Sequence, residues 1–141
     1  MLLVEYQDNG THYNLPGGGL EPGETIVDGV IREAFEETNA EVAVGNLALT
    51  YEFDSHKQSG DYSENESHGL HLIFECTLIN HSIPRLPHNP DLHQVAVKWI
   101  PINELEFILL IPNISKQIKE YVKYRESISL IEDHQLERLN I

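Results

Sequence analysis

A glycine-rich segment that runs directly into an acidic, amphipathic segment is the feature that most limits what this chain can fold into. The run Pro16-Gly17-Gly18-Gly19 and the pair Pro22-Gly23 interrupt regular structure. Behind them, Thr25 and Asp28 have the spacing of a helix-capping pair, and apolar residues recur at helical intervals up to Asn39. Asn39 itself suits the left-handed conformation at a helix end. The sequence therefore predicts a loop that is followed at once by a helix.

Three glutamates of the predicted helix share one of its faces. At about 100° per residue, intervals of three and four residues bring Glu33, Glu36 and Glu37 within roughly 100° of one another. Glu37 also borders the apolar stripe, close in angle to Ile26, so the cluster is drawn toward the core. Like charges at this spacing repel one another. A hard divalent cation such as Mg²⁺ or Mn²⁺, whose preferred ligands are carboxylate oxygens, would offset that repulsion.

The same residues allow a purely structural interpretation. The pattern E-x-x-E-E is commonly a solvated acidic helix face, here with Arg32 paired to Glu36 at i, i+4. A glycine-rich loop by itself can be no more than a turn. The two features gain weight together, because glycines let the backbone approach a ligand with carbonyls toward a metal or amides toward a phosphate.

Strands dominate the rest of the predicted structure. A hairpin is expected at the start of the chain, with its turn at Asp8-Asn9-Gly10. A final helix is expected over residues 113–125. Further strands are expected in apolar-rich runs and loops in polar or proline-rich runs. The predicted strands cover residues 1–6, 12–15, 41–53, 70–80 and 95–100, and the predicted loops cover residues 54–67 and 80–91.

The loop and the helix together resemble the Nudix hydrolases, whose box reads G-x5-E-x7-R-E-U-x-E-E-x-G-U, with U an aliphatic residue. The chain departs from the box at Asn39, which stands in place of glycine, and at Ala34 and Ala40, which stand in place of larger aliphatic residues. The run from Trp99 to Leu105 is similar to the turn by which many Nudix domains leave their last long strand. The charged and glycine positions that the box requires are all filled, by Gly18, Glu24, Arg32, Glu33, Glu36 and Glu37.

The resemblance implies an α+β fold, a Nudix-type α/β/α sandwich with a mixed β-sheet, the box helix on one side and the C-terminal helix on the other. We expect residues 1–141 to form a single Nudix hydrolase domain. The domain is N-terminally short, because such domains usually have another strand before the one at residues 1–6, which is here absent or replaced by another segment. The tail at residues 127–141 is of uncertain structure, and we expect its apolar residues to cover an open sheet edge, within the chain or across a homodimer. These residues are Ile128, Leu130 and Ile131.

The resemblance also implies an activity and a set of site residues. Nudix hydrolases cleave a nucleoside diphosphate linked to a further group, so a small nucleotide-like diphosphate is the expected substrate and Mg²⁺ or Mn²⁺ the expected cofactor. Carried over by position, the metal ligands are Glu33, Glu36, Glu37 and the Gly18 carbonyl. Glu33 is also expected to accept the proton of the attacking water. Arg32 would orient a glutamate, and Glu24 would brace the loop.

Some parts of the expected site remain open. A fourth acidic ligand often comes from outside the box, and no feature of the sequence chooses among its candidates, Glu64, Glu66 and Glu75. Substrate-contacting residues are not identified. The pairs His68 with His71 and Tyr51 with Phe53 could face a substrate, but such residues more often occupy strand ends and cores.

Charge and cysteine content limit the expected partners. The formal charge of -14 would repel a phosphate backbone, which argues against a long nucleic acid. No apolar run approaches the roughly 18 residues of a membrane span, and the first residues do not resemble a secretory signal. Cys76, the single cysteine, cannot form an internal disulfide and lies in an apolar run, so we expect a buried, inert thiol and a cytoplasmic protein.

Two functions of other classes remain as alternatives. The first is a catalytically weak or inactive Nudix-fold module that binds nucleotides or regulates. The second is a plain acidic interaction domain, which would leave the spacing of the box unexplained.

Overall fold

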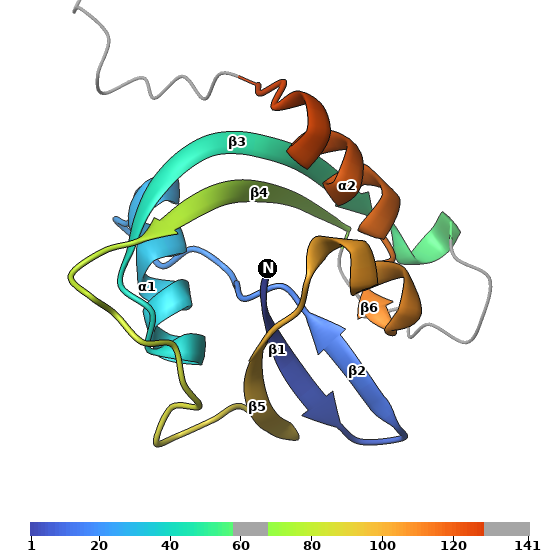
Figure 1. The fold of residues 1–141 in the computed structure, drawn as a ribbon. Helices are drawn as coiled ribbons and strands as arrows, with labels where there is room; N and C mark the ends of the chain where they lie inside the picture. The colour runs from blue at the N-terminus through green and yellow to red at the C-terminus, as the bar shows by residue number, and fades with distance from the viewer. Residues whose placement is uncertain (58–67, 129–141) are drawn as a thin grey trace, which may run out of the picture.

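The computed structural model describes residues 1–57 and 68–128, which form two β-sheets and two α-helices (Figure 1). The first sheet has the strand order β5-β1-β2-β6, in which β1 is antiparallel to both neighbours and β2 is parallel to β6. The second sheet is an antiparallel pair of long strands, β3 and β4. The strands are β1 (Leu2–Gln7), β2 (Thr11–Asn14), β3 (Val42–Phe53), β4 (Gly69–Leu78), β5 (Gln94–Trp99) and β6 (Leu110–Ile111).

The two helices, α1 (Ile26–Thr38) and α2 (Ser115–Tyr124), lie at opposite ends of the curved β3–β4 pair (Figure 1). The start of α1 has a reciprocal cap: the Asp28 amide donates to the Thr25 hydroxyl oxygen (3.1 Å), and the Thr25 amide donates to the Asp28 carboxylate (3.4 Å). At the other end, Asn39 is left-handed with φ 53°. Both predicted helix boundaries are therefore confirmed. The two helices together with the mixed first sheet and the antiparallel β3–β4 pair confirm the predicted α+β class.

All five predicted strands are present, with ends shifted by one or two residues, and the N-terminal hairpin turns at Asp8-Asn9-Gly10 as expected. Gly10 has φ 133°, a conformation that side chains disfavour. Three short elements were not predicted: strand β6 and the 3-10 helices η1 (Ser55–Lys57) and η2 (Ile102–Phe107). The turn after Trp99 enters η2 through a bond from the Glu104 amide to the Pro101 carbonyl (2.9 Å).

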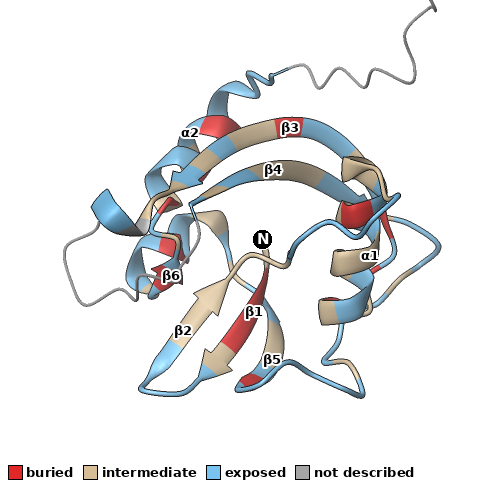
Figure 2. Ribbon diagram, turned by 180° about the vertical axis from the view of Figure 1, so that it is seen from behind, coloured by how far each residue is buried: buried red, intermediate tan, exposed pale blue. Residues whose placement is uncertain are grey.

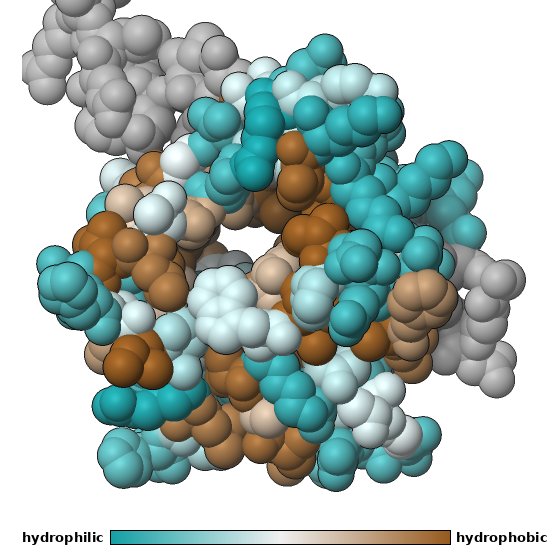
Figure 3. All heavy atoms as spheres, in the orientation of Figure 1, coloured by the Kyte–Doolittle hydropathy of each residue, from teal (hydrophilic) through white to brown (hydrophobic). Residues whose placement is uncertain are grey.

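The core lies between the first sheet, η2 and α2. Its most buried members are Leu3, Leu105 and Leu110, with 0, 1 and 3% of their surface exposed. Figure 2 shows this burial on β1 and around β6 and α2. The apolar stripe of α1 is less buried than expected, because Ile31 and Phe35 are exposed. The β3–β4 pair has no hydrogen-bonded ladder with the first sheet, and Figure 3 shows an opening near the centre of the molecule bordered by hydrophobic residues.

Both edges of β1 are occupied, by β2 and β5, and no strand precedes it among the described residues. At the other end of the chain, the Ile128 amide donates to the Leu47 carbonyl (3.1 Å) in an isolated antiparallel bridge. The remaining tail residues of the edge hypothesis, Leu130 and Ile131, lie outside the described residues.

The prediction of a buried thiol is wrong, because Cys76 is exposed on β4. Strand β4 belongs to a sheet of two strands, in which an apolar run in the sequence does not guarantee burial. The surroundings of Cys76 nevertheless raise the pKa of the thiol, chiefly by partial desolvation. In the part of the chain that the structure describes, neither helix is long and apolar enough to cross a membrane.

Candidate active site

The glycine loop folds back onto the acidic face of α1. The Gly17 amide donates to Oε2 of Glu37 (3.0 Å). At Gly18 the backbone passes so close to Glu33 that a β-carbon there would collide with the carboxylate. The loop therefore meets two of the three predicted acidic ligands, and a larger residue at position 18 would displace the Glu33 carboxylate from its present place.

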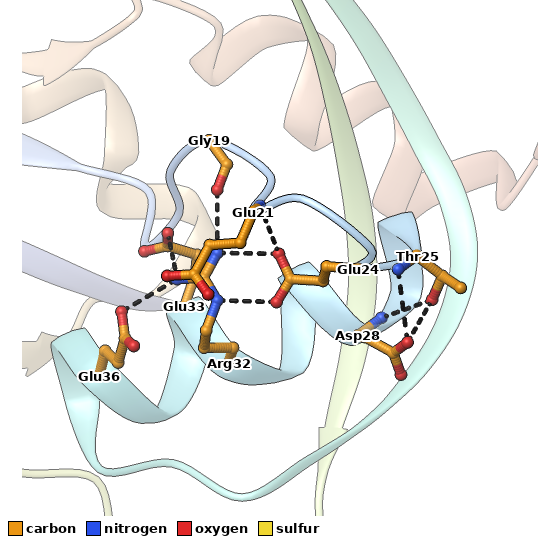
Figure 4. Close-up of polar contacts among 8 residues, drawn as sticks. All are labelled: Gly19, Glu21, Glu24, Thr25, Asp28, Arg32, Glu33 and Glu36. Carbon is orange, nitrogen blue, oxygen red and sulfur yellow. Dashed lines mark hydrogen bonds and ion pairs between the residues drawn. The ribbon is translucent and has the colours of Figure 1, made fainter.

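Arg32 is the centre of the polar network (Figure 4). Its Nε and Nη2 atoms donate to the two carboxylate oxygens of Glu24 (2.7 and 3.0 Å), and Nη2 also donates to the Gly19 carbonyl (2.9 Å). Its Nη1 atom donates to Glu33 (2.7 Å) and Glu36 (3.0 Å). These contacts raise the pKa of the Arg32 guanidinium, with the hydrogen bond to Glu24 as the largest cause. The half-buried Arg32 side chain thus ties the loop, at Gly19, to three carboxylates of the box.

Glu24 fastens the loop from its other end. Besides binding Arg32, its Oε2 atom accepts from the Glu21 amide (3.0 Å). The hydrogen bond from Arg32 lowers the pKa of the Glu24 carboxyl. The loop lies close to α1 at Gly29, where an added β-carbon would press on the Leu20 side chain. Gly29 had no predicted role, because a glycine inside a helix does not reveal what packs against it.

The surroundings of Glu37 strongly shift the pKa of its carboxyl. Burial raises the pKa of its carboxyl to about 7, the Gly17 amide opposes the shift, and the charges of Asp91 and Glu33 add to it. Like charges beside a buried carboxyl favour its protonated form unless a cation lies next to it. Arg32 does not supply one, since its contacts go to Glu24, Glu33 and Glu36.

The three predicted candidates outside the box divide into two groups. Glu64 and Glu66 lie outside the described residues. Glu75 binds α2 instead, accepting from the Tyr121 hydroxyl (2.6 Å) and from Arg125. A further carboxylate, Asp91, had no predicted role, and its charge raises the pKa of Glu37. Nothing in the local sequence marks Asp91, because only the fold brings residues 54 positions apart together.

Three of the residues that could face a substrate have contacts within the protein. His68 pairs with the exposed Glu52 carboxylate (2.6 Å). The rings of His71 and Tyr51 are 5.5 Å apart, and Tyr51 packs against the hydrophobic core.

The carboxylate oxygens of Glu33, Glu36 and Glu37 are suitable ligands for a divalent cation, but their present conformation does not arrange them around one. In residues 1–57 and 68–128, no three His, Cys, Asp or Glu side chains are arranged to hold a metal ion. Arg32 binds oxygens of both Glu33 and Glu36. The carboxylates still converge on the Gly17–Gly18 backbone, and they are hard oxygen donors.

Comparison with known proteins gives a consistent result. The NUDIX domain model matches residues 1–123. A MutT-like protein of Streptomyces ambofaciens is 46% identical over 77 residues, which are 54% of this chain and 42% of that protein. The nucleoside triphosphatase NudI of Salmonella schwarzengrund (strain CVM19633) is 34% identical over 88 residues, which are 58% of this chain and 62% of NudI. The chain thus spans less than two thirds of these curated relatives.

A solved structure, the NUDIX hydrolase from Nitrosomonas europaea, shares the fold with a TM-score of 0.66 at 23% identity, covering 89% of this chain and 82% of the other. The family model covers most of the chain, including the loop, the acidic helix and the turn after Trp99. The chain belongs to the Nudix family.

Proposed function

We propose that the chain is a metal-dependent hydrolase that cleaves a phosphoric anhydride bond in a nucleoside diphosphate linked to another group. The observation that carries the proposal is the convergence of Glu33, Glu36 and Glu37 beside the glycine loop, with Arg32 and Glu24 fixing the two together. The similarity to a nucleoside triphosphatase, although it covers 62% of that relative, points to the same class of substrate.

The residue roles follow from this arrangement. Glu33, Glu36, Glu37 and the Gly18 carbonyl would hold Mg²⁺ or Mn²⁺, and the bound ion would neutralise the charge of the diphosphate and of its leaving phosphate. Arg32 orients Glu33 and Glu36 through its two contacts at Nη1. Glu24 holds Arg32 and the loop in place without contacting the substrate.

Hydrolysis adds one water molecule across the anhydride bond. The water oxygen forms a bond to one phosphorus while the bond from that phosphorus to the bridging oxygen breaks. The bridging oxygen leaves with the bonding electron pair on the departing phosphate. In our proposal the Glu33 carboxylate accepts the proton that the water loses.

A substrate panel tests the proposal. Deoxynucleoside triphosphates, nucleotide sugars, ADP-ribose and dinucleoside polyphosphates would be incubated with the protein in Mg²⁺, in Mn²⁺ and in chelator, and the products identified. We expect cation-dependent release of phosphate, diphosphate or nucleoside monophosphate from at least one substrate. Cleavage that is equally fast in chelator would contradict metal dependence.

The contacts of Arg32 favour one second candidate, a Nudix-fold module that binds a nucleotide without turnover. Arg32 engages Glu33 and Glu36 together, which competes with their use as metal ligands. Binding of a nucleotide from the same panel with no product in either cation would support this second function.

A further inference from the structure

An apolar groove lies between α1 and the neighbouring ends of β3 and β4. It has a volume of about 360 Å³ and is lined by residues of α1, of the start of β3 and of the segment directly after β4. Three large hydrophobic residues that line the groove are exposed: Ile31 (40%), Phe35 (50%) and Ile79 (39%). Exposed hydrophobic residues that border one hollow indicate a site for another apolar segment.

The edge of β3 that faces away from β4 leads to this groove. In the described part of the chain, β3 forms a ladder only with β4, and its other edge has one bridge, between Leu47 and Ile128. The Ile128 amide donates to the Leu47 carbonyl (3.1 Å), and the bridge is antiparallel. A chain that continues from Ile128 along this edge therefore runs from Leu47 toward Val42, which lines the groove.

The end of α2 is fixed at the place where such a continuation starts. The Tyr121 hydroxyl donates to the Glu75 carboxylate of β4 (2.6 Å), and Arg125 binds the same carboxylate. Arg125 has φ 55° and ends the helix in the left-handed conformation. The chain then reaches the edge of β3 at Ile128. Figure 1 shows α2 beside one end of the curved β3–β4 pair and α1 beside the other, so a segment that follows β3 from α2 approaches α1.

The chain after Ile128 is long enough to reach the groove. The path from Leu47 to Val42 covers five residues of β3, which is about 17 Å at the rise of a β-strand. Residues 129–141, which lie outside the described residues, can span up to about 43 Å when extended. About five of these residues are needed to reach Val42, so the others can lie over the groove.

The apolar residues of this segment are placed in two groups that match the path. Leu130 and Ile131 fall in the part next to β3, and Leu136, Leu139 and Ile141 fall in the part that reaches the groove. Because the segment belongs to the same chain, its local concentration at the groove exceeds that of a second copy in dilute solution. The segment is therefore favoured over a second copy as the occupant.

We propose that residues 129–141 pair antiparallel with the free edge of β3 and place the side chains of Leu136 and Leu139 in the groove beside Ile31 and Phe35 of the same chain. The segment then covers an open strand edge and an exposed apolar patch together. The inference is independent of the proposed function, because no residue that lines the groove is a proposed metal ligand.

Paramagnetic NMR on the full chain tests the path of the segment. A nitroxide is attached to Cys76, the single cysteine, which is exposed on β4 opposite Val44. We expect the amide signals of residues 130–136 to broaden, whereas those of the turn between β1 and β2, in the other sheet, stay sharp. Tail signals that remain sharp would overturn the inference.

A mixed sample distinguishes binding within one chain from binding between two chains. One chain is isotope-labelled, carries Cys76→Ser and has no nitroxide, and the other carries the nitroxide and no isotope. We expect no broadening of the tail signals in this sample. Broadening there would place the segment on a second copy and would contradict the proposal.

Thermal melts of variants test the groove. The tail variant Leu136→Ser with Leu139→Ser and the groove variant Ile31→Ser with Ile79→Ser should each lower the melting temperature by about 4 °C or more. The control Leu92→Ser, at a residue that is 81% exposed, should melt like the wild type. Because the tail and the groove contact each other in this proposal, all four substitutions together should melt no lower than the groove variant. Additive losses, or a tail variant that melts like the control, would refute docking in the groove.

Discussion

Replacing Glu37 by glutamine should make the cation-free protein more stable, relative to the wild type, at pH 8 than at pH 5. Burial raises the pKa of the Glu37 carboxyl from 4.5 to about 7 in the folded state. Between these two values the folded protein keeps a proton that the unfolded chain releases. Stability is therefore highest below the unfolded pKa and is lost as the pH rises from about 4.5 through about 7. The Gln variant cannot titrate at this position and avoids that loss.

The magnitude follows from the shift. A difference between 4.5 and about 7 would cost the wild type about 2.5 kcal/mol of unfolding free energy between pH 5 and pH 8. Because the side chain is only partly buried, solvent screening reduces this to about 1 kcal/mol. For a chain of this length, that corresponds to a relative change in melting temperature of about 3 to 5 °C.

Thermal melts in chelator at pH 5 and pH 8 check this prediction, with Glu120→Gln as the matched control on the exposed side of α2. Other carboxyls give the wild type an opposite slope, since hydrogen bonds lower the pKa values of Glu5, Glu24 and Glu75. The measured quantity is therefore the difference between variant and wild type at the two pH values. If the variant differs from the wild type by the same amount at both pH values, the pKa of the Glu37 carboxyl is not raised in the folded state.

Three further results are expected. Glu36→Gln should lower turnover by at least about a hundredfold, because loss of a metal ligand exceeds the effect of a lost supporting contact; near-normal turnover of the pure variant in a steady-state assay would remove Glu36 from the site. Mg²⁺ or Mn²⁺ should stabilise the wild type by about 2.7 kcal/mol at a hundred times Kd, visible as a higher melting temperature, whereas the double variant Glu36→Gln with Glu37→Gln should lose most of this rise and lose activity. Deletion after Arg125 should lower the melting temperature or cause association, because it removes the Ile128–Leu47 bridge at the β3 edge; a truncated protein that melts and elutes like the parent would leave the tail without this role.

The elements that the sequence predicted well are those with strong local signals. The Thr25–Asp28 cap and the left-handed Asn39 define α1 through contacts within a few residues. The hairpin turn at Asp8-Asn9-Gly10 is equally local. Strand β6, by contrast, has two residues and exists because the fold brings Leu110 and Ile111 beside β2. No sequence window carries that pairing.

The predicted site shows the same division. The spacing of Arg32 and the box glutamates predicts that they share a face, and the structure adds which oxygen atoms Arg32 binds. The effect of Asp91 on the pKa of Glu37 and the hydrogen bond from the Gln94 side chain to the Glu37 carbonyl could not be predicted, because both depend on how β5 lies against α1. The exposure of Ile31 and Phe35 also depends on tertiary packing, which helical periodicity does not report.

The central claim is that a cation held by the acidic face of α1 drives cleavage of a diphosphate bond. The most direct measurement compares, in one buffer, the Mn²⁺ dissociation constant of the protein with the Mn²⁺ concentration that gives half-maximal hydrolysis of its best substrate. Hydrolysis is measured at a saturating and at a subsaturating substrate concentration, so that Mn²⁺ binding to the protein is distinguished from Mn²⁺ binding to the nucleotide. We predict that the two cation constants agree at low substrate and that Glu36→Gln shifts both upward together. Hydrolysis that persists in chelator, or that the Glu36→Gln variant performs at the wild-type rate and cation concentration, would contradict the claim.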